Sequence, residues 1–209
     1  MTEGGSIVDR MLVGRGSRRA LVENAALVAS GGVLGGLVLA RSTDTAASAA
    51  SKATDRKILT FALTLERLQV AFYQAMLAKP YATGEIRQYA ETVHGHEVAH
   101  VRRLTEALGA VAAPVTFTFG QTLASRDAFT KAAIAIEDMG AAAYDGQIPN
   151  LTTGALRIAS EIVSVEARHA AWIRDIGGEQ PAPVPADPAA TPQEVQSKLR
   201  SLGISIGGA

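Results

Sequence analysis

The sequence predicts an all-α protein: a four-helix bundle with one long crossover between its second and third helices, a Pro-rich arm and a short last helix. Three observations support this prediction. Four stretches repeat apolar side chains at the three- and four-residue spacing of a helix. Glu-x-x-His occurs twice, at Glu97 to His100 and at Glu166 to His169, and residues three apart share one helix face. The two other helices each carry one inward Glu, which completes the side-chain set of a two-metal bundle.

Composition excludes several classes of protein. The 209-residue chain is 47% hydrophobic, which suits one domain with extensions. Its 20 Lys and Arg balance its 20 Asp and Glu, so the basic surface that nucleic-acid binding needs is not expected. There is no cysteine, which excludes disulfides and Cys-ligated zinc or iron–sulfur sites.

Residues 1–50 have the three-part order of an export signal. A basic stretch ends in Arg18-Arg19, an apolar Gly-rich stretch covers residues 20–40, and Ala47-Ser48-Ala49 is a suitable cleavage site. The arginine pair resembles the twin-arginine signal, with Ala20 where Phe is usual. We expect a protein exported to the periplasm or cell envelope. Retention of residues 20–40 as a membrane anchor is the second interpretation, and a cytosolic amphipathic extension is the least favoured.

The bundle is assigned to residues 55–178. Lys79-Pro80 and Gly109 end the first two helices, and Gly177-Gly178 ends the fourth. Ser125 or Asp127 caps the third. The helices are expected over residues 55–78, 84–108, 125–146 and 152–176.

Each predicted helix carries a glutamate inside its apolar stripe, where a carboxylate must be paired, protonated or bound to metal. The four are Glu66, Glu97, Glu137 and Glu166. His100 and His169 lie on the same inward faces. His94 and His96 flank the stripe of the second helix, and we expect His94 to be solvated.

Residues 110–126 form the crossover. Polar and apolar residues alternate from Val115 to Gly120, but a single strand has no evident partner. We therefore expect a loop that packs Phe117 and Phe119 over the bundle.

Residues 179–209 follow the bundle. Their Pro-rich first part is either an extended arm along the bundle or a flexible tail. A short helix is predicted to start at Thr191-Pro192, and its apolar edge either docks on the bundle or mediates association. The Gly-rich end is expected to fray. The apolar edge consists of Val195, Leu199 and Leu202.

An internal repeat relates the two helix pairs. Glu66 and Glu137 are 71 residues apart, as are Tyr73 and Tyr144. The two Glu-x-x-His segments are 69 residues apart. Such pseudo-twofold symmetry suits two metal ions with equivalent ligands.

The repeat predicts a role for each candidate ligand. Glu66 and Glu137 would each bind one ion as terminal or bidentate ligands, Glu97 and Glu166 would bridge the ions, and His100 and His169 would each complete one. Tyr73 and Tyr144 are candidates for hydrogen bonding around the ligands or for electron relay. The rival interpretation is a metal-free hydrogen-bond network of the same side chains.

Four segments carry a resemblance to a known family: Leu63 to Tyr73, Glu97 to Val101, Glu137 to Tyr144 and Glu166 to Ala171. They resemble the ferritin-like domain of exported bacterial proteins, and plant desiccation-related and fungal stress-related proteins are similar. The resemblance covers residues 55–176 and fills all six ligand positions. It implies a di-iron or di-manganese site and a stress context. Four carboxylates with two imidazoles and no thiolate independently suit iron or manganese, and zinc also fits.

Three functions fit these expectations to different degrees. The first is a redox metalloprotein, an oxidoreductase that reacts with dioxygen or peroxide or oxidises ferrous iron. The alternative is a metal-poor structural or interaction module of the cell envelope, with the Pro-rich arm as its docking segment or as a contact between subunits. Iron storage in a closed shell is the least favoured. The expected partners are metal ions, and a membrane only if residues 20–40 are retained.

Overall fold

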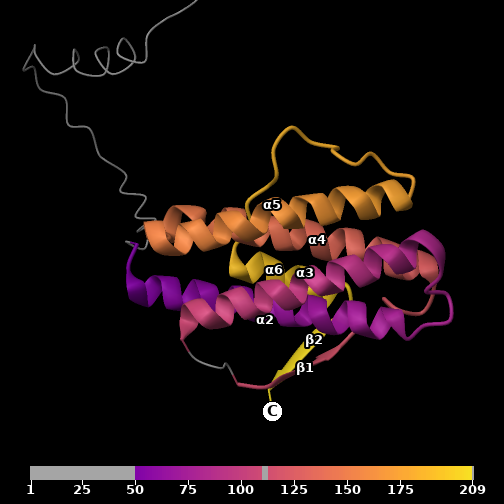
Figure 1. The fold of residues 1–209 in the computed structure, drawn as a ribbon, viewed down its shortest axis with the longest axis horizontal. Helices are drawn as coiled ribbons and strands as arrows, with labels where there is room; N and C mark the ends of the chain where they lie inside the picture. Colours follow the sequence, from indigo (N-terminus) through magenta and orange to yellow (C-terminus); the bar gives the residue numbers. More distant parts are fainter. Residues whose placement is uncertain (1–49, 110–112, 209) are drawn as a thin grey trace, which may run out of the picture. The chain divides into compact units, whose positions relative to one another are not determined.

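The computed structural model describes residues 50–109 and 113–208, which contain two helical hairpins packed into one bundle (Figure 1). The first hairpin pairs α2 (Lys52–Leu77) with α3 (Gly84–Leu108). The second pairs α4 (Arg126–Gln147) with α5 (Thr153–Ile176), joined through the 3-10 turn η2 (Ile148–Asn150). The predicted four-helix bundle with a long second connection is confirmed.

Short polar side chains and glycine set the helix ends. Ser51 caps α2, because its hydroxyl accepts a hydrogen bond from the Thr54 amide at 3.1 Å. Ser125, and not Asp127, caps α4 in the same way. Gly109 ends α3 in the left-handed conformation, with φ of 62°.

Two apolar clusters lie on either side of a polar layer. One contains Phe72, Tyr89 and Phe129, and the other contains Leu63 and Leu104. Along α2, Glu66 lies between Leu63 of one cluster and Phe72 of the other, and the inward acidic residues of α3, α4 and α5 are flanked in the same manner. The folding of the four amphipathic helices therefore encloses the carboxylates in the middle of the bundle.

The crossover contains a strand, so the loop expected there is wrong in part. β1 (Val115–Thr118) pairs antiparallel with β2 (Ser205–Gly208), with Phe117 opposite Ile206. The Gly-rich end is thus paired and not frayed. The sequence does not predict the β1–β2 pairing, because β2 lies far along the chain from β1, after all the bundle helices. As predicted, Phe117 and Phe119 pack against the bundle core.

The carboxy-terminal segment docks on its own bundle. α6 (Pro192–Ser201) begins with a capping box between Thr191 and Glu194, and Pro192 occupies its first turn. Val195 and Leu199 are 1% and 3% exposed and join the larger apolar cluster. The apolar edge of this helix therefore packs within the chain.

The Pro-rich arm between α5 and α6 arches over the second hairpin (Figure 1). Residues 179–189 are exposed, and the arm returns to α4 where the amide of Ala190 donates to the carbonyl of Ala142 at 2.8 Å. Gly146 makes this contact possible, because a Cβ there would overlap the Ala190 carbonyl oxygen. The arm is therefore fixed to the bundle at its far end.

The predicted export signal and the predicted anchor at residues 20–40 lie outside the described residues. Among the helices within residues 50–109 and 113–208, none is long and apolar enough to cross a bilayer.

Asp55 links the start of α2 to the start of α5. Its two carboxylate oxygens accept from the amide of Thr152 at 2.9 Å and from the Thr152 hydroxyl at 2.5 Å, and it is 9% exposed. Asp55→Ala should lower the free energy of unfolding by about 1–2 kcal/mol, because it leaves the amide and hydroxyl of Thr152, the N-cap residue of α5, without their acceptor. Urea unfolding measures this. Lys57→Ala, at an exposed position of α2, should change stability by less than about 0.5 kcal/mol, and equal effects of the two substitutions would contradict this role of Asp55.

Candidate metal centre

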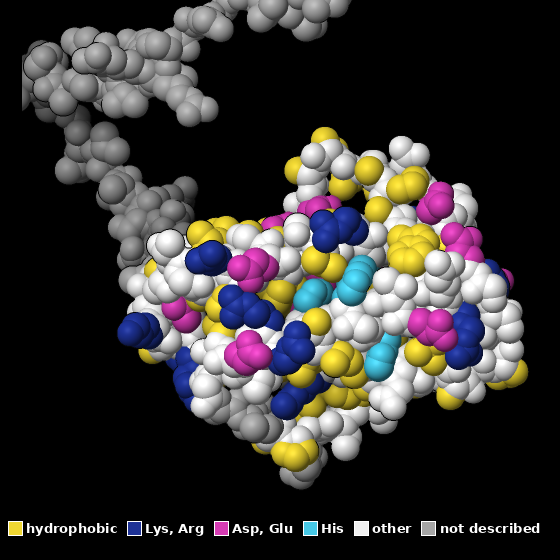
Figure 2. All heavy atoms as spheres, in the orientation of Figure 1, with side chains coloured by type: hydrophobic (Ala, Val, Ile, Leu, Met, Phe, Trp, Pro, Cys, Tyr) yellow, Lys and Arg dark blue, Asp and Glu magenta, His cyan; other side chains and the backbone are white. Residues whose placement is uncertain are grey.

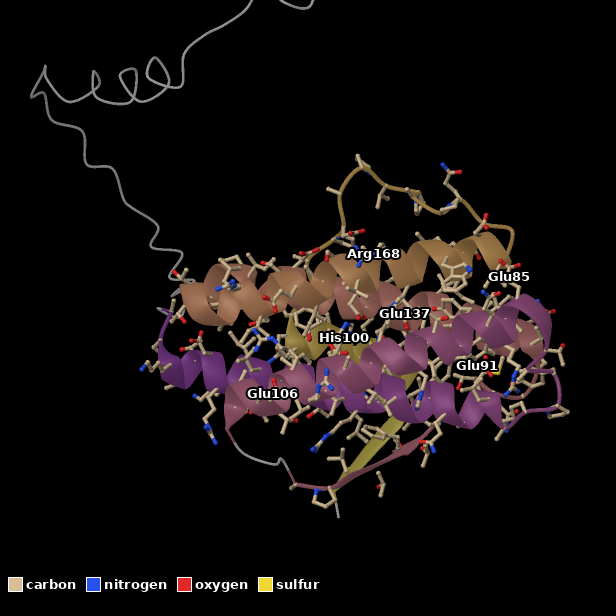
Figure 3. All side chains as sticks on the ribbon, in the orientation of Figure 1. Glu85, Glu91, His100, Glu106, Glu137 and Arg168 are labelled. Carbon is tan, nitrogen blue, oxygen red and sulfur yellow. The ribbon has the colours of Figure 1, made fainter. Side chains whose placement is uncertain are left out.

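All six candidate ligands converge in the polar layer between the two hairpins. α2 supplies Glu66, α3 supplies Glu97 and His100, α4 supplies Glu137, and α5 supplies Glu166 and His169. The most exposed of them, His100, is only 8% exposed. Figure 3 shows His100 and Glu137 inside the bundle, whereas Glu85, Glu91 and Glu106 lie on its surface.

The six side chains form two overlapping groups, within each of which the ligand atoms lie within 4.8 Å of one another. Glu97 and Glu166 belong to both groups, as expected for bridging residues. The His100 group consists of Glu66, Glu97, His100 and Glu166, and the His169 group consists of Glu97, Glu137, Glu166 and His169.

Both imidazoles direct Nδ1 at the carboxylates. Nδ1 of His100 lies 3.1 Å from Oε2 of Glu97 and 3.2 Å from Oε2 of Glu66. Nδ1 of His169 lies 3.2 Å from Oε1 of Glu97 and 3.2 Å from Oε2 of Glu137. Glu97 therefore presents one carboxylate oxygen to each histidine.

The two tyrosines bond across the bundle. The Tyr144 hydroxyl, on α4, donates to Oε1 of Glu66 on α2 at 2.5 Å. The Tyr73 hydroxyl, on α2, donates to Oε1 of Glu137 on α4. Burial and the adjacent carboxylates raise the pKa of both tyrosines well above the usual value, so both remain protonated donors.

Burial perturbs the charged groups strongly. It raises the pKa of Glu66 to about 8, and the nearby Glu97 carboxylate adds to this effect. Burial also raises the pKa of Glu166. For His169, burial alone would lower the pKa, but the adjacent carboxylates of Glu137 and Glu97 outweigh it and raise the pKa to about 10. The metal-free centre thus binds protons where a metal ion would supply positive charge.

Two carboxylate oxygens in the centre make no hydrogen bond of good geometry. They are Oε1 of Glu97 and Oε1 of Glu166, both buried, and no donor in the described part of the chain is well aligned with either. Nδ1 of His169 lies 3.2 Å from the first and Nδ1 of His100 lies 3.3 Å from the second, but each nitrogen is shared with other carboxylate oxygens. Burying an anionic oxygen without a well-aligned donor is unfavourable. Both atoms belong to the residues shared by the two groups, which is where bridging oxygens of a two-ion centre would lie. The residues present therefore fit a pair of divalent ions.

Four contributors to the centre were missed from the sequence. Gln69 donates through Nε2 to Oε2 of Glu166 at 3.0 Å. Gly140 makes room there, because a Cβ on it would lie 2.6 Å from that oxygen. Tyr89 shares a 3.0 Å hydrogen bond with the Tyr73 hydroxyl. Gln69 follows Glu66 by three residues on the same helix face, so its helical position could have revealed it.

His96 is the fourth missed contributor. Its Nδ1 lies 2.9 Å from Nε2 of His169, and the two rings stack with centroids 5.2 Å apart. Burial and the nearby His169, His100 and Arg168 lower the pKa of His96, which favours the neutral ring. Because the raised pKa of His169 keeps both of its ring nitrogens protonated, Nε2 of His169 is assigned as the donor to the neutral His96.

Other histidine and acidic side chains of the bundle helices lie outside the centre. His94 is half-buried and belongs to neither group, although it is less solvated than expected. Asp138 pairs with Arg174, and the exposed Glu161 pairs with Arg103 at 3.1 Å.

Comparison with known proteins agrees with this geometry. The sequence model of the family described as "Ferritin-like domain" matches residues 54–179, more than half of the chain and all six candidate ligands. No curated protein is significantly similar to the chain. Together with the four-helix bundle, the match shows that the protein belongs to the ferritin-like domain family.

Proposed function

We propose that the protein binds two divalent metal ions, iron or manganese, and uses them for redox chemistry with dioxygen or peroxide. The observation that carries this proposal is the pair of buried oxygens on Glu97 and Glu166 that make no hydrogen bond of good geometry, within a cluster of four carboxylates and two imidazoles. Oxygen and imidazole ligands without thiolate suit iron and manganese, and zinc is a third occupant. Two adjacent iron or manganese ions can exchange electrons with dioxygen or peroxide and can oxidise ferrous iron.

The chain's own residues would bind, orient and enclose the ions. Glu66 and Glu137 would be terminal ligands, and Tyr144 and Tyr73 fix one oxygen of each. The apolar clusters on either side limit the access of bulk water to the centre, which strengthens electrostatic interactions there. Gln69 fixes the shared Glu166 through its other oxygen.

We further propose export to the cell envelope and a role in stress. The order of charged, apolar and small residues in residues 1–50 supports the location. The resemblance to stress-related ferritin-like proteins supports the role. Amino-terminal sequencing of the mature protein tests the location, and an unprocessed protein in the cytosolic fraction would contradict it.

Metal analysis tests the binding. Protein produced with iron and manganese in the medium should carry two ions per chain, one for each group of ligands. Glu97→Ala should lose both ions, because Glu97 belongs to both groups. Glu91→Ala, at an exposed position of α3, is the matched control and should retain them. A well-folded wild type that binds neither iron nor manganese would refute the proposal.

An oxidation assay of the same proteins tests the chemistry. The metal-free protein is loaded anaerobically with ferrous iron and then mixed with air or hydrogen peroxide. Wild type and Glu91→Ala should oxidise the iron or consume peroxide at least ~10-fold faster than Glu97→Ala. Equal rates in all three proteins would leave metal binding without a redox function.

The stability of the metal-free protein should fall as pH rises. The folded-state pKa of Glu66, about 8, lies above its ordinary value of 4.5. Its stabilising contribution is therefore fully present below pH 4.5 and is lost as pH rises through 8. The contribution of His169 has the same sign, being fully present below pH 6.5 and lost as pH rises through about 10.

Denaturation in the presence of a chelator measures this effect. Between about pH 5 and 8, we expect a loss on the order of 2 kcal/mol, which Glu66→Gln should reduce. Glu91→Gln, at an exposed position of α3, should retain the loss. The stabilisation of the protein by saturating manganese should increase as pH rises over the same range, because the ligand side chains must lose protons to bind the ion. Stability of the metal-free protein that rises from pH 5 to 8 would contradict these pKa shifts.

A further inference from the structure

The two halves of the centre differ in the groups around their ligands. Matching positions lie 71 residues apart in α2 and α4, and 69 apart in α3 and α5. The six ligands and the two tyrosines that bond to them obey this correspondence. Four residues near the His169 group do not. Gln69, Tyr89, His96 and Trp172 correspond to Gly140, Ile158, Val165 and Arg103.

Hydrogen bonds from neighbouring side chains orient the ligands of the His169 group, including on the side of the His169 ring that faces away from the carboxylates. His96 accepts the hydrogen bond from Nε2 of His169, which fixes the ring with Nδ1 toward the carboxylates. Gln69 donates to Glu137 at 3.4 Å, in addition to Glu166. Hydrogen-bond partners of this kind orient metal ligands, and their loss commonly weakens metal binding by ~10–100-fold.

Large aromatic side chains pack beside the same group. Tyr73, which bonds Glu137, also bonds Tyr89, and the ring of Tyr89 contacts Trp172 edge to face at a centroid distance of 5.2 Å. Trp172 lies one helical turn beyond His169 on α5. His169, on which the His96 ring stacks, is 3% exposed.

The His100 group lacks this outer support. Val165, the counterpart of His96, cannot accept a hydrogen bond, and no group within the described ranges bonds to Nε2 of His100. Only Nδ1 of His100 is held, by the carboxylates. Its ring is therefore oriented from one side alone.

The His100 group also opens to the surface. A cavity of about 410 Å³ reaches His100 between α3 and α5. Arg103, the counterpart of Trp172, lines it and pairs with Glu161 at 3.1 Å, and both side chains are well exposed. An exposed pair of this kind costs ~1 kcal/mol or less to open. Figure 2 shows this face, where histidine lies among Arg, Lys and acidic side chains. The remaining lining residues are Ala99, Arg102, Glu106 and Ile162.

We propose that the two metal positions are unequal: the His169 group holds a resident ion, and the His100 group binds a weaker, exchangeable divalent ion that enters through the cavity. His96 is the positioning residue that creates most of the difference. The inference rests on the proposed metal binding and adds an order of filling and a route. Ferrous iron used as a substrate would occupy the His100 position.

Calorimetric titration of the metal-free full-length protein with manganese tests the inequality. Wild type should bind two ions in separate steps, and electron paramagnetic resonance at one equivalent should show isolated ions, with magnetic coupling only at two. His96→Ala should weaken the first step by ~10-fold or more and leave the second unchanged. His96 is exposed, so the fold should persist, and His96→Gln, which restores an acceptor, should recover part of the lost affinity.

The corresponding position supplies the control and a gain-of-function test. Val165→Ala should leave the first step unchanged. Val165→His, which gives the His100 group the partner that it lacks, should tighten the second step. Two ions of equal affinity in the wild type, or equal weakening of both steps in His96→Ala, would overturn the inference while the proposed metal binding stands. Failure of the wild type to bind manganese, iron or zinc would overturn both.

Discussion

The enclosure of four carboxylates in one apolar core is the constraint on which the rest of this structure depends. Unpaired buried anions would destabilise the bundle, so each Glu needs a compensating proton, donor or cation. Two imidazoles, two tyrosine hydroxyls and the Gln69 amide supply part of this compensation. The oxygens of Glu97 and Glu166 that make no hydrogen bond of good geometry mark where it remains incomplete. The metal-free bundle is therefore less stable than it would be without these carboxylates, and a bound metal ion would offset that cost.

The crossed tyrosine bonds make the centre part of the architecture as well as the chemistry. Tyr73 and Glu137 lie on different hairpins, as do Tyr144 and Glu66. Displacing one hairpin along the other would break both bonds and separate the ligand groups. The polar layer therefore fixes how the two hairpins align, which the apolar clusters alone would specify less strictly because apolar contacts are not directional.

The sequence predicts the features that depend on helical periodicity, and it predicts few of the contacts between segments that are distant in the chain. Helical spacing places the six candidate ligands on inward faces, and they converge in the structure. His96 was missed because it lies at the edge of its helix face and acts through His169 on another helix. The β1–β2 ribbon was missed because strand pairing between distant segments leaves no local signal. The roles of residues as metal ligands, and the function of residues 1–50, stay predictions.

The β1–β2 ribbon also gives the chain an order of assembly. The bundle's largest interhelical contacts lie within each hairpin, between neighbouring segments of chain, and such contacts form early. β1 has no partner until Ser205–Gly208 has been synthesised, after all four bundle helices. We therefore expect the carboxylate centre to assemble while the crossover is still unpaired. Metal binding would then not depend on the β1–β2 pairing, and a chain that ends before Ser205 would reveal this by its metal content.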